Sequence, residues 1–254
     1  MTKSVTGTLF GVLEHQNRIK VIDNAPIVAW KNDDRKQITI HNLLQMNSGL
    51  EWHEKRIGLS DAVKMLYLDL DMTQRQIIAR MLGKPNETWN YSSGTTNILS
   101  TILRQQFKTH QEYLNFWYAA LIDKTGMNSM LIETDLVGNY VGSSYGWATA
   151  RDWSKLGLLY LHDGTWNGEE LFTEKWVKYA TTPTPTSDGS YGAHIRLNAG
   201  GKYANVPKNM YFFSGYQGQN VYILPDQDLV VVRMGLTENA DIDIFLSGIF
   251  ESIK

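Results

Sequence analysis

The chain has 254 residues, with 24 basic and 26 acidic side chains and no cysteine. Because the charges are balanced, the composition lacks the excess of basic residues typical of nucleic-acid-binding proteins. The absence of cysteine excludes disulfides and thiolate metal sites. No apolar run reaches the roughly 18 residues that a membrane span needs. We expect one domain over residues 1–254, which is long enough for a sizeable core.

The first part of the chain predicts mostly helices. Apolar residues recur at helical spacing after Met1, so Lys3 is expected in the first turn of a helix. Thr39 is a candidate N-cap, and Thr149 with Asp152 three residues later resembles a capping box. The expected helices are residues 2–16, 41–46, one or two over 61–82, 94–103, 113–124, 149–162 and 173–179.

The end of the chain changes to strand patterns. The expected strands are 191–197, 210–216, 219–224 and 229–235, and a helix over 241–253 closes the chain. Residues 229–232 are continuously apolar, which predicts a strand buried on both faces. Together these patterns predict an α+β fold, in which an antiparallel sheet is flanked by helices. A mostly helical region is expected over about 39–180, and the sheet with its helix over about 190–254.

The first chemical signal is at the start of the chain. A serine placed before Met1 would give Ser-Met-Thr-Lys, the S-x-x-K signature of a nucleophile and its lysine. A serine hydroxyl needs a nearby base, and residues three apart share a helix face. Ser4 is on a different face from Lys3 and is a poor substitute. We therefore expect that this chain starts one residue after the nucleophile.

Two later segments supply the remaining chemistry. Tyr91-Ser92-Ser93 directly precedes a predicted helix. The Tyr91 phenol, if it lies beside a lysine, could pass a proton to the leaving group. Tyr216-Gln217-Gly218-Gln219 is expected on a strand edge, where glycine permits a ligand to approach the backbone. Backbone N–H groups at such a place can hold an oxyanion.

Five segments in chain order carry a family resemblance. They are residues 41–50 (HNLLQMNSGL), 90–94 (NYSSG), 150–158 (ARDWSKLGL), 164–168 (GTWNG) and 215–219 (GYQGQ). With Lys3, they make the chain resemble the β-lactamase-like serine hydrolases. The branch nearest in pattern contains class C β-lactamases, related esterases and 6-aminohexanoate-dimer hydrolase-like amidases. The resemblance implies a β-lactamase/transpeptidase-like fold.

The resemblance also implies roles for the site residues. Lys3 would help to deprotonate the serine, Tyr91 would act as general base and acid, and the Gln219 backbone N–H would donate to the oxyanion. Ser93 stands where class C β-lactamases have asparagine, and Tyr216-Gln217-Gly218 where they have Lys-Thr-Gly. These departures favour ester or amide bonds of a small-molecule substrate over β-lactams. The reaction would pass through an acyl-enzyme without metal or cofactor.

Other interpretations stay open. Without a nucleophile the chain is expected to be inactive, and it could instead be a pseudoenzyme or ligand-binding module of the same fold. Gly142-Ser143-Ser144-Tyr145-Gly146 also matches the G-x-S-x-G elbow of an α/β-hydrolase, with His162 and His194 after it. Removal of upstream strands would leave an apolar sheet edge and favour self-association. Periplasmic and cytoplasmic locations both fit, because a signal peptide would lie upstream of Met1.

Overall fold

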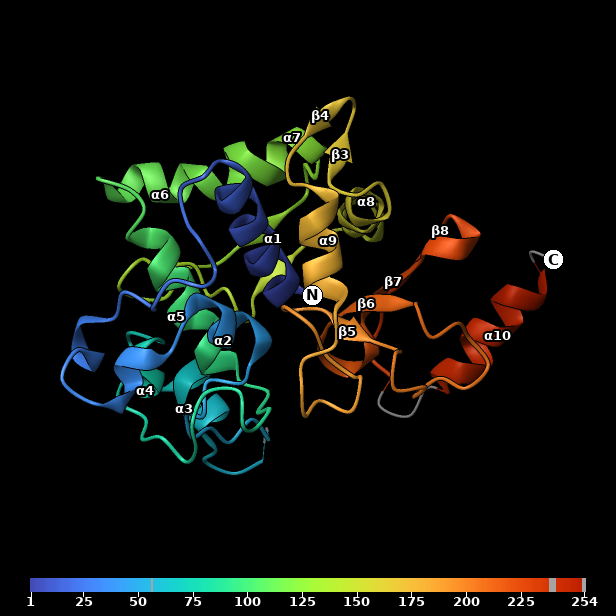
Figure 1. Cartoon of the computed structure of the whole chain (residues 1–254). Helices are drawn as coiled ribbons and strands as arrows, with labels where there is room; N and C mark the ends of the chain where they lie inside the picture. The colour runs from blue at the N-terminus through green and yellow to red at the C-terminus, as the bar shows by residue number, and fades with distance from the viewer. Residues whose placement is uncertain (56, 238–240, 253–254) are drawn as a thin grey trace.

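The computed structural model describes residues 1–55, 57–237 and 241–252 (Figure 1). Its helices are α1 (Thr2–His15), α2 (Ile40–Gln45), α3 (Asp61–Tyr67), α4 (Gln74–Ile77), α5 (Ser93–Arg104), α6 (His110–Trp117), α7 (Asp123–Thr125), α8 (Ala150–Leu161), α9 (Glu174–Thr181) and α10 (Ile242–Ser252). Its strands are β1 (Leu131–Ile132), β2 (Gly146–Trp147), β3 (Thr165–Trp166), β4 (Glu169–Glu170), β5 (Arg196–Leu197), β6 (Tyr211–Ser214), β7 (Asn220–Leu224) and β8 (Leu229–Arg233). The predicted α+β class is confirmed, with helices first and the main sheet last.

Local capping explains where several helices begin. The Thr39 hydroxyl oxygen accepts a hydrogen bond from the Asn42 N–H, and the Thr39 N–H donates to the Asn42 side-chain oxygen. The two bonds form a capping box. The Thr149 hydroxyl accepts from the Asp152 N–H at 3.3 Å. The Asp152 carboxylate does not accept a hydrogen bond from the Thr149 N–H, because it accepts from Ser129 and Lys155 instead. The predicted capping box at α8 is therefore only half formed.

The helix predicted over 113–124 is longer and less regular than expected. It begins at α6, where Thr109 and Glu112 form a capping box. It continues through a π-helical turn, η3 (Tyr118–Ile122), into α7. Gly126 ends it with φ +69°, a left-handed conformation that suits glycine.

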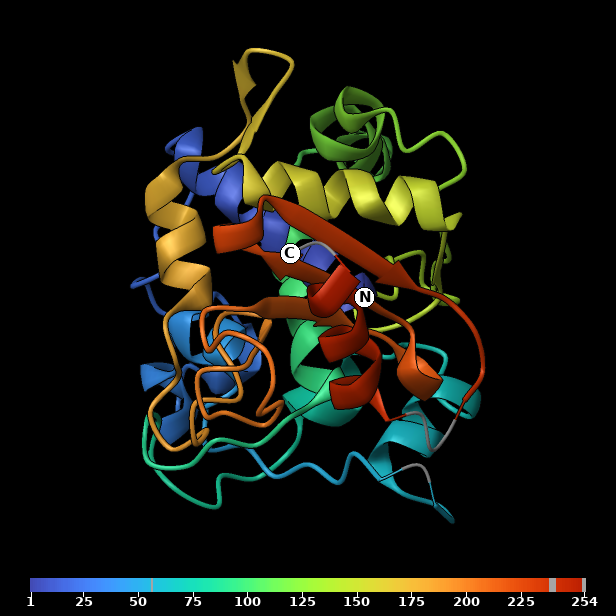
Figure 2. The ribbon, with the colours of Figure 1, turned by 90° about the vertical axis from the view of Figure 1, so that its right-hand side faces the viewer.

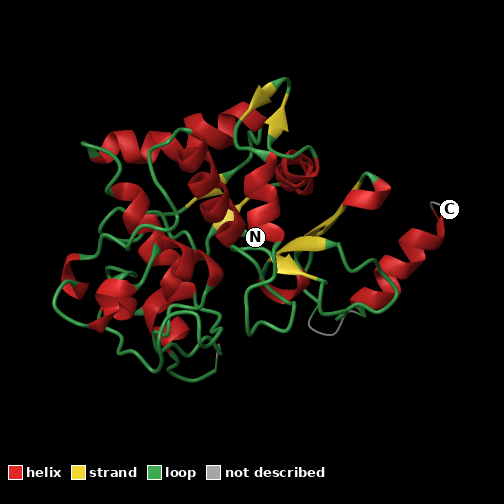
Figure 3. Ribbon diagram, viewed as in Figure 1, coloured by secondary structure: helices red, strands yellow, loops and turns green. Residues whose placement is uncertain are grey.

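The main sheet is antiparallel, with strand order β5-β6-β7-β8. Figure 3 shows strands of this sheet in yellow, apart from the helices of the first part of the chain. Helix α8 packs on one face, and a side chain at Gly157 would collide with Val230 and Val221 at 2.7 and 2.8 Å. Glycine at this position therefore permits the close approach of α8 to the sheet. Helix α10 packs on the other face, where Leu246 joins a small apolar cluster with strand residues (Figure 2). The predicted arrangement of helices around the sheet is thus confirmed.

Two strand predictions were wrong in extent or burial. The strand expected over 191–197 is reduced to β5, because residues 192–195 form a tight turn in which the Gly192 N–H donates to the Ile195 carbonyl and His194 has φ +58°. Strand β8 was expected to be buried on both faces, but all its residues are only half-buried. The physical reason is that β8 is an edge strand, and no described strand pairs with its outer side.

The core is centred on α1, in which Thr2 to Leu13 are all buried. Helix α5 and the π-helical turn η3 pack against it, so α1 is surrounded by protein rather than amphipathic. The predicted helix end at residue 253 lies outside the described residues. Among the helices of the described residues, none has the length and apolar character needed to cross a membrane.

Candidate active site

A cavity of about 790 Å³ opens at the N-terminus of α1. The Met1 backbone nitrogen donates to the Ser214 carbonyl, which places this helix end against the last residue of β6. The cavity is lined by Met1, Thr2, Lys3, Glu54, Leu66, Tyr67, Tyr91, Ser129, Ser143, Ser144, Tyr145, Gly146, Trp147, Ala148, Thr149, Trp153, Arg196, Ser214, Gly215, Tyr216, Gln217, Gln219 and Met234. Helix α1, the start of α5 and the sheet therefore meet around one space.

Lys3 lies in the first turn of α1, as predicted, and its side chain is ordered by two acceptors. Its Nζ donates to Ser93 Oγ at 2.8 Å and to the Ser143 carbonyl at 3.0 Å. The same nitrogen lies 5.0 Å from the centre of the Tyr91 ring. The structure therefore brings together Lys3, Tyr91 and Ser93, which are as much as 90 positions apart in the chain.

Ser93 is fully buried behind the cavity and links Lys3 to a carboxylate. Its hydroxyl accepts from Lys3 and donates to Glu54 Oε1 at 2.6 Å, and its backbone N–H donates to Glu54 Oε2 at 2.8 Å. The Trp52 indole N–H also donates to Oε2, at 2.6 Å. Ser93 is the first residue of α5, where a carboxylate is favoured by the helix dipole. The result is a continuous hydrogen-bonded line from Lys3 through Ser93 to Glu54.

Tyr91 belongs to an aromatic cluster beside the cavity. Its ring meets Tyr191 edge-on at 5.7 Å and Trp89 at 6.4 Å. The Arg196 guanidinium stacks over Tyr91 with its carbon 4.4 Å from the ring centre. Burial raises the pKa of Tyr191, with the neighbouring Tyr91 acting in the same direction, so the Tyr191 phenol stays neutral.

The Tyr216-Gln217-Gly218-Gln219 segment is at the cavity but is not a strand edge as expected. It is the turn between β6 and β7, and its first three residues form a 3₁₀ turn, η4 (Tyr216–Gly218), in which Gln217 has φ +55°. Gly218 is not among the described residues that line the cavity, and its carbonyl accepts a hydrogen bond from Arg233. The Gln219 N–H donates to the Tyr216 carbonyl at 3.4 Å within the turn. Its role toward an oxyanion stays a prediction.

The G-x-S-x-G segment does not form a nucleophile elbow. Residues 142–144 form a turn and bend rather than the end of a buried strand, and no helix follows until Ala150. No histidine is among the described residues that line the cavity with Ser144. His194 is buried, its Nδ1 donates to the Leu44 carbonyl, and its Nε2 accepts from the Thr96 hydroxyl. Ser144 therefore lacks the base that an α/β-hydrolase requires.

Ser4 is also unsuited to act as a nucleophile. Its hydroxyl donates to the His194 carbonyl at 2.8 Å, and the residue is 3% exposed. It therefore points into the core, on a different face from Lys3, as the helical spacing predicts.

Glu54 and Arg196 are the two site residues that the sequence reasoning missed. Glu54 follows a predicted loop, and Arg196 is in a predicted strand that belongs to no motif. Arg196 has one sequence signal, a charge between the apolar residues Ile195 and Leu197, whereas Glu54 stands among other charged residues and has none. Only the folded chain shows that both line the cavity with Lys3.

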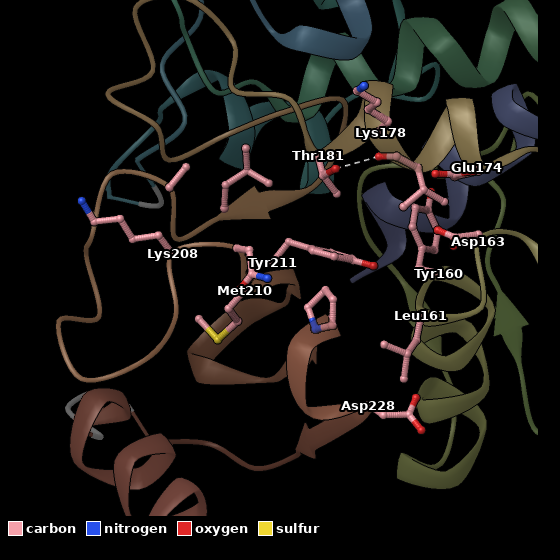
Figure 4. A pocket seen from close by; sticks show the side chains of 15 residues that line it. Tyr160, Leu161, Asp163, Glu174, Lys178, Thr181, Lys208, Met210, Tyr211 and Asp228 are labelled. Atoms are coloured by element: carbon pink, nitrogen blue, oxygen red, sulfur yellow. Dashed lines mark hydrogen bonds between the residues drawn. The ribbon is translucent and has the colours of Figure 1, made fainter.

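A second cavity of about 600 Å³ is separate from this site and shares none of its described lining residues. Figure 4 shows Tyr160, Asp163 and Glu174 on one side of it and Lys208 and Met210 on the other. In the described ranges, no three histidine or acidic side chains are grouped so that they could hold a metal ion.

Comparison with known proteins identifies the family and the fold. The family model described as Beta-lactamase matches residues 1–238. No match was found among curated proteins. A solved structure assigned as a 6-aminohexanoate-dimer hydrolase from Bacillus anthracis is 20% identical, with a TM-score of 0.79, and covers 99% of this chain and 69% of that chain.

Two further structures show the same fold. A family VIII carboxylesterase is 14% identical, with a TM-score of 0.74 over 100% of this chain and 82% of that chain. A penicillin-binding protein homologue from Caulobacter crescentus is 16% identical, with a TM-score of 0.72 and the same coverage of 100% and 82%. The expected β-lactamase/transpeptidase-like fold is confirmed, and it excludes the α/β-hydrolase alternative.

Proposed function

This chain belongs to the β-lactamase family, and from that premise we propose that it is the body of a serine hydrolase that cleaves ester or amide bonds through an acyl-enzyme. The nucleophile is a serine directly before Met1. The observation that carries this proposal is that Lys3 and Tyr91 line one cavity, with the Lys3 nitrogen 5.0 Å from the Tyr91 ring centre and hydrogen-bonded at 2.8 Å to the buried Ser93 Oγ.

Lys3 is the base for the first step. The position before Met1 is three residues before Lys3, so their side chains share a face where α1 is extended past its N-cap, Met1, to that position. A neutral amine has two N–H groups and one lone pair, and Ser93 and the Ser143 carbonyl already accept from the nitrogen. The lone pair is then free to take the serine proton.

Tyr91 is the acid for the second step. The serine oxygen forms a bond to the carbonyl carbon, and the tetrahedral intermediate then releases the alcohol or amine. Tyr91 gives its proton to the leaving group and recovers one from Lys3, whose nitrogen is 5.0 Å from the phenol ring centre. Water then attacks the acyl-enzyme with the same groups in reverse roles, and the serine is regenerated.

One feature favours esters or amides over β-lactams. Tyr216-Gln217-Gly218 occupies the turn where class C β-lactamases have Lys-Thr-Gly, so this turn provides no cation. No metal or cofactor is part of the proposal.

The test compares the 254-residue chain with the same chain carrying a serine before Met1. Both are assayed with p-nitrophenyl esters and matched anilides. We expect hydrolysis by the serine-bearing chain and almost none by the other, and Lys3→Met or Tyr91→Phe should lower kcat by about 100-fold or more. Rapid hydrolysis by the 254-residue chain that Ser4→Ala abolishes would overturn the proposal.

The alternative, a ligand-binding module without turnover, is favoured only by the intact cavity beside Lys3. It predicts ligand binding by both chains and no hydrolysis by either. Activity that depends on the added serine and on Tyr91 would exclude it.

A further inference from the structure

Arg196 is the second cation of the cavity, and it belongs to none of the motifs. Among the described lining residues the charged side chains are Lys3, Glu54 and Arg196. Arg196 is in β5, next to β6 in the sheet, so its backbone is held by pairing with Phe212. It therefore presents its charge from a rigid strand.

The guanidinium of Arg196 lies among three aromatic rings. Its carbon is 4.4 Å from the ring centre of Tyr91, 5.2 Å from that of Tyr191 and 5.7 Å from that of Trp89. Cation–π contacts of this kind depend on the charge of the group and occupy none of its N–H donors in conventional hydrogen bonds. The part of the chain that the structure describes provides no hydrogen-bond acceptor or ion-pair partner for those donors.

The nearby carboxylate does not neutralise Arg196. Both oxygens of Glu54 accept bonds from elsewhere, namely the Ser93 hydroxyl, the Ser93 N–H and the Trp52 indole. The Glu54 carboxylate is thus directed toward the start of α5. Arg196 is therefore a half-buried cation at the cavity surface, and its guanidinium N–H groups are available to a ligand.

We propose that Arg196 determines specificity by binding a carboxylate carried by the substrate. A guanidinium group matches a carboxylate in two parallel hydrogen bonds, and the three aromatic rings around Arg196 restrict where its guanidinium can move. The turn at Tyr216-Gln217-Gly218 has no cation, so the substrate carboxylate is bound from strand β5 instead. The inference rests on the proposed function and restricts its substrate class to acidic esters or amides.

The test measures binding to the 254-residue chain, so it needs no nucleophile. The probes are N-hexanoylglycine, which has a carboxylate, and the neutral N-hexanoylglycinamide, with affinities measured by calorimetry. We expect the carboxylate to bind about tenfold tighter. Arg196→Gln should abolish this difference, and Arg196→Lys, which keeps the charge and loses the fork, should retain only part of it.

Lys202→Gln is the matched control. Burial and the charge of Arg196 lower the pKa of Lys202, so the two cations are neighbours, but Lys202 does not line the cavity. This variant should keep the preference for the carboxylate. Added salt should weaken the preference in the unaltered chain, a measurement that does not depend on the folding of any variant.

Three results would overturn the inference. They are equal affinities for the two probes, a preference that persists in Arg196→Gln, and no binding of either probe at millimolar concentration. The result is separable from the proposed function, because turnover by the serine-bearing chain can depend on Lys3 whether or not Arg196 selects an anion.

Discussion

Lowering the pH from 7 to 5 should destabilise this protein through His194. Its Nδ1 donates to the Leu44 carbonyl at 2.8 Å and its Nε2 is 3.0 Å from the Thr96 hydroxyl, so a second proton on the ring would remove an acceptor. Burial, with the charge of Lys3 acting in the same direction, lowers the pKa of His194 from 6.5 to about 3, although the bond to Leu44 opposes the shift. The folded protein therefore holds this imidazole neutral.

The sign and size follow from proton linkage. The unfolded chain binds a proton at His194 near pH 6.5, and the folded chain does not until about pH 3. Stability from this group is thus present above pH 6.5 and is lost as the pH falls toward 3. Since one pKa unit corresponds to about 1.4 kcal/mol, the loss of unfolding free energy between pH 7 and pH 5 is about 2 kcal/mol.

Urea unfolding at both pH values, for the unaltered chain and His194→Asn, measures this loss. Asparagine tolerates the positive φ of +58° at this position. His41, whose pKa burial also lowers, contributes to both proteins and cancels in the comparison. The unaltered chain should lose about 2 kcal/mol more than the variant between the two pH values. Equal losses would refute the assignment of the pH dependence to His194.

Two further predictions concern packing and assembly. Gly157→Ala should lower the unfolding free energy by about 1–3 kcal/mol, because its Cβ would meet Val230 at 2.7 Å. Gly248→Ala in α10 is the matched control: it meets no atom within 4 Å, and it should gain up to about 1 kcal/mol from helix propensity, as urea unfolding can show. The open edge of β8 should cause concentration-dependent self-association, and a constant monomeric mass in light scattering across a dilution series would contradict this.

The sequence by itself determined the local features of this protein. The N-caps at Thr39 and Thr149 depend on residues three positions apart, so their signals are complete in short segments. The position of Lys3 in the first turn of α1 follows from the same helical spacing. The ordered motifs also indicated the family before any geometry was known.

Only the tertiary structure decided which side chains share the site and which strand lies at the edge. The bonds from Lys3 to Ser93 and from Ser93 to Glu54 join residues 90 and 39 positions apart, and no local pattern encodes such contacts. Arg196 reaches the cavity because residues 192–195 turn the chain back, which a strand pattern could not reveal. The apolar run of β8 indicates a strand but not its neighbours, because burial of a strand depends on which elements pack against it.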